Sequence, residues 1–107
     1  MKLGDARRIA LALPEAAEAP HFDFTSFRVR GKIFATAPPE GGHLHVFVAD
    51  EDREQALELH PEYIEKLWWG KRVVGLRVRL ARAPAPIVRE LLARAWKRKA
   101  PKALAAG

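Results

Sequence analysis

The chain has 107 residues, and residues 1–107 suit one domain with a hydrophobic core of its own. It contains no cysteine, which excludes disulfides, thiolate catalysis and zinc sites built on cysteine. Residues 1–70 carry 8 Lys and Arg against 12 Asp and Glu, whereas residues 71–107 carry 11 against one acid, for a formal net charge of +6. This asymmetry favours a polyanionic partner over chemistry on a small molecule.

The first predicted element is a helix over residues 5–13. Asp5 is placed to cap its N-terminus, and Pro14 is placed to end it. Small and aliphatic side chains recur at helical spacing along one face, whereas Arg7 and Arg8 fall outside that face. We therefore expect an amphipathic helix whose apolar face packs on the core.

From Thr25 the apolar period changes to two, which predicts a strand. Phe27 and Val29 share one face of it, and the opposite face carries Ser26, Arg28 and Arg30. If helices cover the apolar face, the arginines project from the other side of the sheet.

Two further strands complete a predicted meander. Gly31-Lys32 forms a tight turn before a return strand over residues 33–37. Pro38–Gly42 is the next turn, and a strand over residues 43–49 follows it. The outward positions of that strand are His43, His45 and Phe47. Consecutive strands joined by short turns are expected to pair antiparallel.

The middle of the chain predicts two helices. Residues 50–52 are Asp-Glu-Asp, which is typical of a capped helix with acids in its first turn, and this helix runs to about His60. Pro61 suits the first turn of a second, short helix that ends at Trp68. That helix is expected to bury four apolar side chains, namely Tyr63, Ile64, Leu67 and Trp68.

The last predicted elements are a strand over residues 74–80 and a helix that follows Pro86. The strand alternates aliphatic residues with Gly75, Arg77 and Arg79. Residues after about 100 are expected to fray. Runs of strands with helices at both ends indicate an α+β fold, in which helices pack on one face of an antiparallel sheet.

Three short motifs resemble those of a known family. They are Leu11-Ala12-Leu13-Pro14-Glu15, then Pro20-His21-Phe22, and then the segment from Ser26 to Ala35, of which Gly31-Lys32-Ile33-Phe34-Ala35 is the most specific. The chain resembles the MmcQ/YjbR family of small bacterial proteins along nearly its whole length. The resemblance implies a frataxin-like (CyaY-like) sandwich with a strongly bent antiparallel sheet, and it implies DNA binding. It brings no catalytic residues.

The strand arginines are the leading candidates for a binding surface. The predicted nucleic-acid-binding residues are Arg28, Arg30, Lys32, Lys71, Arg72, Arg77 and Arg79. Guanidinium groups suit bidentate contacts with phosphate, so these side chains can neutralise a nucleic-acid backbone if they form one patch. The alternative is that they are ordinary solvated charges on outward strand positions, and the sequence leaves both interpretations open.

Aromatic side chains add candidates for base stacking. His45, Phe47 and Trp69 are the predicted stacking residues, because stacking suits single-stranded nucleic acid. Trp68 is assigned to the core from its spacing to Ile64, and the position of Trp69 is left undecided.

Other chemistry finds little support in the sequence. His43 and His45 share a strand face without a third metal ligand nearby, so no metal site and no cofactor are predicted. Glu15 and Glu18 flank an expected loop without a partner nucleophile, and Ser26 lacks the context of a nucleophile elbow. We therefore expect a protein that is not an enzyme.

The expected function is nucleic-acid binding, in which the arginine-rich face contacts phosphates. DNA is the expected nucleic acid. The alternatives are a protein-interaction module whose basic surface meets an acidic partner and, third, a frataxin-like metal carrier. The sequence shows neither a signal peptide nor a membrane span, so a cytoplasmic location is expected. The absence of Asn and the 8 prolines suit a thermophile or a GC-rich genome.

Overall fold

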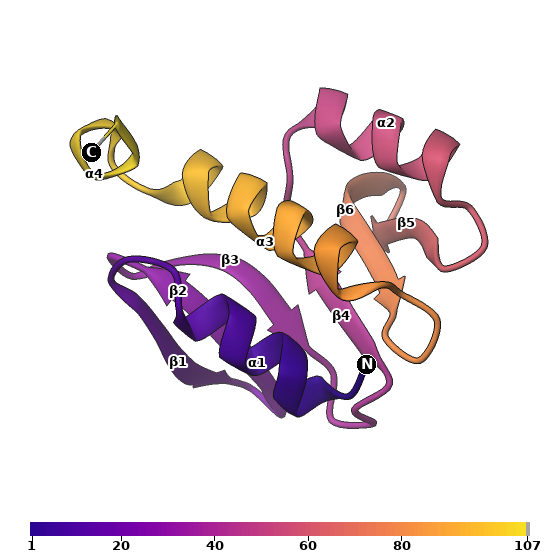
Figure 1. Cartoon of the computed structure of the whole chain (residues 1–107), viewed down its shortest axis with the longest axis horizontal. Helices are drawn as coiled ribbons and strands as arrows, with labels where there is room; N and C mark the ends of the chain where they lie inside the picture. Colours follow the sequence, from indigo (N-terminus) through magenta and orange to yellow (C-terminus); the bar gives the residue numbers. More distant parts are fainter. Residues whose placement is uncertain (107) are drawn as a thin grey trace.

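The fold is given by a computed structural model that describes residues 1–106. In chain order the elements are α1 (Leu3–Leu11), β1 (Ala16–His21), β2 (Phe24–Val29), β3 (Lys32–Ala37), β4 (His43–Val46), α2 (Asp50–Leu59), β5 (Ile64–Trp69), β6 (Arg72–Arg79), α3 (Ala85–Lys99) and α4 (Lys102–Ala106). Figure 1 shows α1 and α3 side by side in front of the strands, with α2 beside β5 and β6.

The strands form one six-stranded antiparallel sheet in the order β1-β2-β3-β4-β6-β5. The predicted α+β class and the helices packed on an antiparallel sheet are thus confirmed. The middle of the sheet has its shortest ladder: β3 and β4 pair at Ala35 with Val46 and at Thr36 with His45, and the N–H of Phe47 donates to the carbonyl of Phe34 at 3.1 Å. Beyond these pairs the two halves, β1-β2-β3 and β4-β6-β5, diverge (Figure 1).

The core lies between the helices and the inner face of the sheet. The inward positions expected on β2, β4 and β6 are confirmed for Phe27, Leu44 and Val78, which are fully buried. Leu92 of α3 is fully buried against them, and two small residues of α1 let this helix pack closely on α3. At about 25 cal/mol per Å² of apolar surface removed from water, this burial is the main stabilising term. Helices α1, α2 and α3 all contribute buried residues to this core.

The hairpin between β2 and β3 turns one residue earlier than the sequence predicts. Val29 pairs with Lys32, and the two residues between them, Arg30 and Gly31, both have positive φ, at 50° and 82°. Positive φ at both central positions is the pattern of a type I′ turn, which matches the twist of the flanking strands. Arg30 is therefore a turn residue, and not an outward position on a strand.

A first edge strand, β1, replaces the loop expected between Glu15 and Glu18. It pairs with β2 along its whole length, from Ala16 with Val29 to His21 with Phe24. Its sequence is rich in alanine and contains Pro20, which cannot donate a ladder hydrogen bond. Proline is tolerated here because β1 lies at the edge of the sheet and has a partner on one side only.

The second edge strand, β5, replaces the short helix expected over Pro61–Trp68. Ile64 and Leu67 are spaced as on a helix, but Ile64 pairs with Val78 and the ladder with β6 continues to Trp69. The assignment of Trp68 to the core is also wrong, because 56% of this residue is exposed.

The two ends of the chain also differ from the prediction. Helix α1 begins at Leu3, so Asp5 lies in its first turn and accepts a hydrogen bond from the backbone N–H of Lys2 at 2.9 Å. The segment after residue 100 forms the short helix α4 where a frayed end was expected, and Leu104 packs on the edge of the core.

Candidate functional site

The outer face of the sheet carries a charged network centred on Arg77 of β6. Arg77 donates to His45 Nε2 and to His43 Nδ1, both at 3.2 Å, and its Nε lies 3.2 Å from Glu65 Oε1. Because a guanidinium has no acceptor, His45 Nε2 must present its lone pair to Arg77, whereas His43 Nδ1 also lies 3.1 Å from Glu40 Oε1. Antiparallel pairing sets the network up, since His45, Arg77 and Glu65 are neighbours across β4, β6 and β5.

His45 is buried although its strand position faces away from the core. Burial lowers its pKa to about 4 from the ordinary 6.5, and the positive charge of Arg77 and the neighbouring His43 act in the same direction. Its ring also lies 6.0 Å from that of Phe24, between centroids. The side chain is therefore a neutral acceptor for Arg77 near neutral pH.

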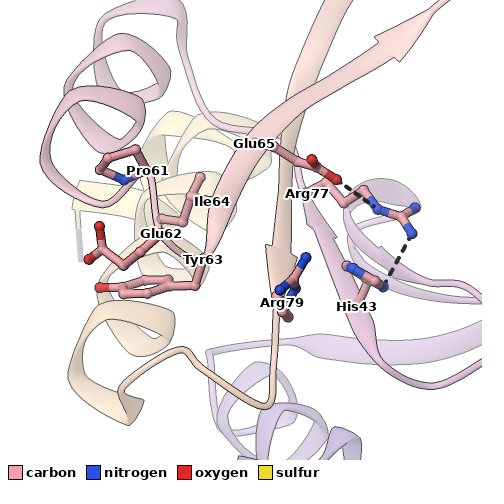
Figure 2. Close-up of a pocket in the computed structure, with 8 residues that line it drawn as sticks. All are labelled: His43, Pro61, Glu62, Tyr63, Ile64, Glu65, Arg77 and Arg79. Carbon is pink, nitrogen blue, oxygen red and sulfur yellow. Dashed lines mark hydrogen bonds and ion pairs between the residues drawn. The ribbon is translucent and has the colours of Figure 1, made fainter.

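The hollow beside this network is too small to hold a ligand. Figure 2 shows Arg77 between Glu65 and His43, and Arg79 and Tyr63 also line the hollow. Its volume is about 50 Å³, whereas ligand sites usually measure ~300–1,000 Å³. The cluster thus serves to fix Arg77 in place.

Two more of the predicted arginines are engaged locally. Arg30 forms a two-point ion pair with Glu15, at 2.6 and 3.0 Å, which ties the β2–β3 turn to the start of β1. Arg28 donates from Nε to Ser26 Oγ at 2.9 Å, and Ser26 in turn donates to the carbonyl of Ala19. Arg30 and Arg77 thus have carboxylate partners, so the structure places no continuous row of unpaired arginines across the sheet.

The other predicted cations lie in two places. Arg79, at the far end of β6, is exposed near His43. Lys32 begins β3, and Lys71 and Arg72 lie at the β5–β6 turn. Since β3 and β6 are both antiparallel to β4, their first residues lie toward the same end of the sheet. We call this set, Lys32, Lys71 and Arg72, the hairpin cations; they are exposed, and none has an ion pair among residues 1–106.

A much larger groove of about 660 Å³ crosses the outer face. Residues from both halves of the sheet and from the end of α3 line it, and most of its surface is apolar. The lining residues are His21, Phe22, Asp23, Phe24, Ile33, Thr36, His45, Phe47, Leu67, Trp68, Trp69, Val74 and Lys99. We call it the aromatic groove.

The structure brings the three predicted stacking residues together in this groove. His45, Phe47 and Trp69 all line it, although they come from β4, the segment after it and β5. Sequence reasoning missed Phe22 and misplaced Trp68, which also line it. The exposed fractions are 92% for Phe22, 77% for Trp69 and 56% for Trp68. The adjacent tryptophans, Trp68 and Trp69, were a feature of the sequence from which an exposed aromatic surface could be predicted. No feature of the sequence singled out Phe22.

The C-terminal turn of α3 adds positive charge to the groove. Arg98 donates to the carbonyls of Phe47 and Val48, at 3.2 and 2.9 Å, which fixes this end of the helix where β4 leaves the sheet. Lys99 lines the groove. Its pKa is lowered by burial and then by the charges of Arg98 and Lys32, so three cations are crowded here.

Residues 1–106 lack the groups for two other kinds of site. No cluster of three or more histidine, aspartate or glutamate side chains is arranged to hold a metal ion in that part of the chain. None of its helices is both long and apolar enough to cross a bilayer.

The sequence profile of the YjbR family matches residues 11–98. The chain belongs to the YjbR family. Its fold is similar to the crystal structure of Deinococcus radiodurans protein DR2400, which carries the domain DUF419, with a TM-score of 0.75 over 90% of this chain and 76% of that one. The two sequences are 22% identical, so this likeness concerns the YjbR fold. None of the curated proteins compared with the chain matches it.

Proposed function

We propose that the outer face of the sheet binds nucleic acid, with the hairpin cations and Lys99 contacting phosphates. The observation that carries the proposal is that Lys32, Lys71 and Arg72 have no acidic partner among residues 1–106 and lie at the end of the sheet where Lys99 enters the groove. Phosphate neutralisation with counterion release would supply the affinity. DNA is the expected polymer, in line with the resemblance noted in the sequence.

The proposal is of a binding protein without catalytic activity. The titratable side chains that line the groove are His21, Asp23, His45 and Lys99. No hydrogen bond joins any two of them within the described part of the chain. Covalent catalysis needs a nucleophile held within hydrogen-bond reach of a base. The four titratable lining residues form no such pair, which supports a binding role independently of the charges.

The test is the salt dependence of oligonucleotide binding. Replacing Lys71 and Arg72 together by alanine should weaken binding to an oligothymidylate and reduce the magnitude of the log–log salt slope by about 1.4, which is ~0.7 for each lost phosphate contact. The matched control is the double replacement of Arg82 and Arg89, which removes the same charge from exposed positions near the other end of the sheet and on α3. Binding that is absent at low salt, or equal losses in both variants, would contradict the proposal.

The acidic-protein alternative uses the same cations, and one comparison separates it. Polyglutamate offers negative charge without bases. We expect polyglutamate to displace a bound oligonucleotide from the protein only weakly when the two polymers are compared at equal total charge. Competition as strong as that of the oligonucleotide itself would favour the protein-interaction module.

A further inference from the structure

We propose that the aromatic groove takes the unstacked bases of a single strand, which makes the ligand single-stranded nucleic acid in preference to a duplex. This inference rests on the proposed function and deepens it. The hairpin cations account for phosphate contact, but they do not account for an apolar groove of about 660 Å³ beside them.

Three large aromatic side chains are exposed on one face. Phe22, Trp68 and Trp69 come from opposite halves of the sheet and line the same groove. Leaving a ring of this size in water forgoes the gain of burying it, so a clustered set marks a binding surface more often than a scattered one. Each ring can stack on a base of any kind, because every base has a π face.

The backbone at Phe22 gives a second, independent argument. Phe22 and Asp23 are the two central residues of the β1–β2 hairpin, and only Phe22 of the pair has positive φ, at 58°. This is the pattern of a type II′ turn, which favours glycine at the first central position. A phenylalanine there is strained, and its ring is exposed, with the His21 ring in an edge-to-face arrangement at 4.9 Å between centroids. Folding alone therefore does not explain this residue.

Charge around the groove argues for a polyanion with apolar parts over a purely apolar ligand. Trp69 and Arg72 are paired across the β5–β6 hairpin, so a ring and a cation lie side by side. Lys99 lines the groove and lies close enough to Arg98 and Lys32 for their charges to act on it. Asp23 is the one carboxylate among the lining residues. Nucleic acid combines flat apolar bases with phosphates at short intervals, and only a single strand presents its base faces freely.

The test compares three probes on the full chain at one salt concentration. They are an oligothymidylate, an abasic oligomer of the same length, and a duplex of that length. We expect the oligothymidylate to bind at least about tenfold more tightly than the abasic oligomer, because stacking adds to phosphate contact. We also expect it to bind more tightly than the duplex. Equal binding of the oligothymidylate and abasic oligomers would overturn the inference but leave the proposed function intact. No salt-dependent binding of any probe would overturn both.

Two variants place the effect in the groove. Trp69→Ala and Phe22→Gly should each weaken oligothymidylate binding about fivefold or more and leave binding of the abasic oligomer unchanged. The control is Leu59→Ala, which removes an apolar side chain of similar exposure, 60%, from α2. Phe22→Gly should not lower the unfolding temperature, since glycine suits the turn. A lowered unfolding temperature with unchanged binding would assign Phe22 a structural role and contradict the inference.

Discussion

At the scale of single residues, the most informative side chain is His45. An outward strand position normally gives a solvated side chain, yet His45 is buried and accepts a hydrogen bond from Arg77. Sequence alternation predicts which face a residue takes, and it did so correctly here. It does not predict how deeply that face is covered, because the cover comes from Phe24 of a distant strand.

The pH dependence of stability follows from this burial. The pKa of His45 is lowered to about 4 in the folded chain, against 6.5 when unfolded. Between these two pH values the unfolded state binds the proton and the folded state does not. The free energy of unfolding is therefore unaffected by this residue above pH 6.5, and it decreases as the pH falls from 6.5 toward 4. Arg77, His43 and Glu40 are the charged and titratable groups that act on it.

We expect the free energy of unfolding to fall by up to about 3 kcal/mol between pH 6.5 and 4 through His45 alone. Urea unfolding across this range measures it. His45→Gln, which keeps an acceptor for Arg77, should flatten the dependence above pH 4.5, below which Asp5, Glu15 and Glu40, whose pKa values are lowered, add their own loss. An unchanged pH profile in His45→Gln would contradict this assignment.

At the scale of elements, the sequence predicts the central strands and fails at both edges. β2, β3, β4 and β6 each have a partner strand on both sides, and their apolar side chains supply much of the buried core. The misread elements, β1 and β5, are the two edge strands. An edge strand has one partner, so alanine, proline or helically spaced residues are tolerated there, and the local pattern no longer identifies the structure.

The same edges explain why the site was only partly predictable. His45, Phe47 and Trp69 were identified as aromatic residues outside the core. Their convergence depends on β5 being a strand beside β6, and on the sheet opening between β3 and β4. Phe22 became visible only once β1 was seen to form a hairpin with β2.

The close approach of β6 to β4 gives a prediction at this scale. A Cβ on Gly75 would lie 2.6 Å from the carbonyl oxygen of Val46 and 3.2 Å from the Phe47 ring. Gly75→Ala should therefore destabilise the chain by about 1–3 kcal/mol, because backbone must move. Gly4→Ala is the control, since a Cβ there meets nothing within 4 Å and alanine favours helix α1. Thermal unfolding measures both; a neutral Gly75→Ala would show that the two strands lie farther apart.

At the scale of the whole molecule, the charge asymmetry of the chain becomes a difference between surfaces. Many acids are paired on or between helices, as in Arg8 with Asp5 and Arg94 with Asp52. The hairpin cations and Lys99 lie at one end of the sheet, next to the aromatic groove. Part of the excess positive charge thus lies beside a surface of exposed rings, and this combination supports the proposed binding of nucleic acid.

The indole N–H resonances of the three tryptophans test that claim most directly. Trp68 and Trp69 line the groove, whereas Trp96 is buried on α3 and donates from Nε1 to the carbonyl of Pro14 at 2.9 Å. On titration with oligothymidylate, two-dimensional NMR should show the Trp68 and Trp69 signals shifting together while the Trp96 signal stays in place. Binding that leaves the Trp68 and Trp69 signals unmoved would contradict the account.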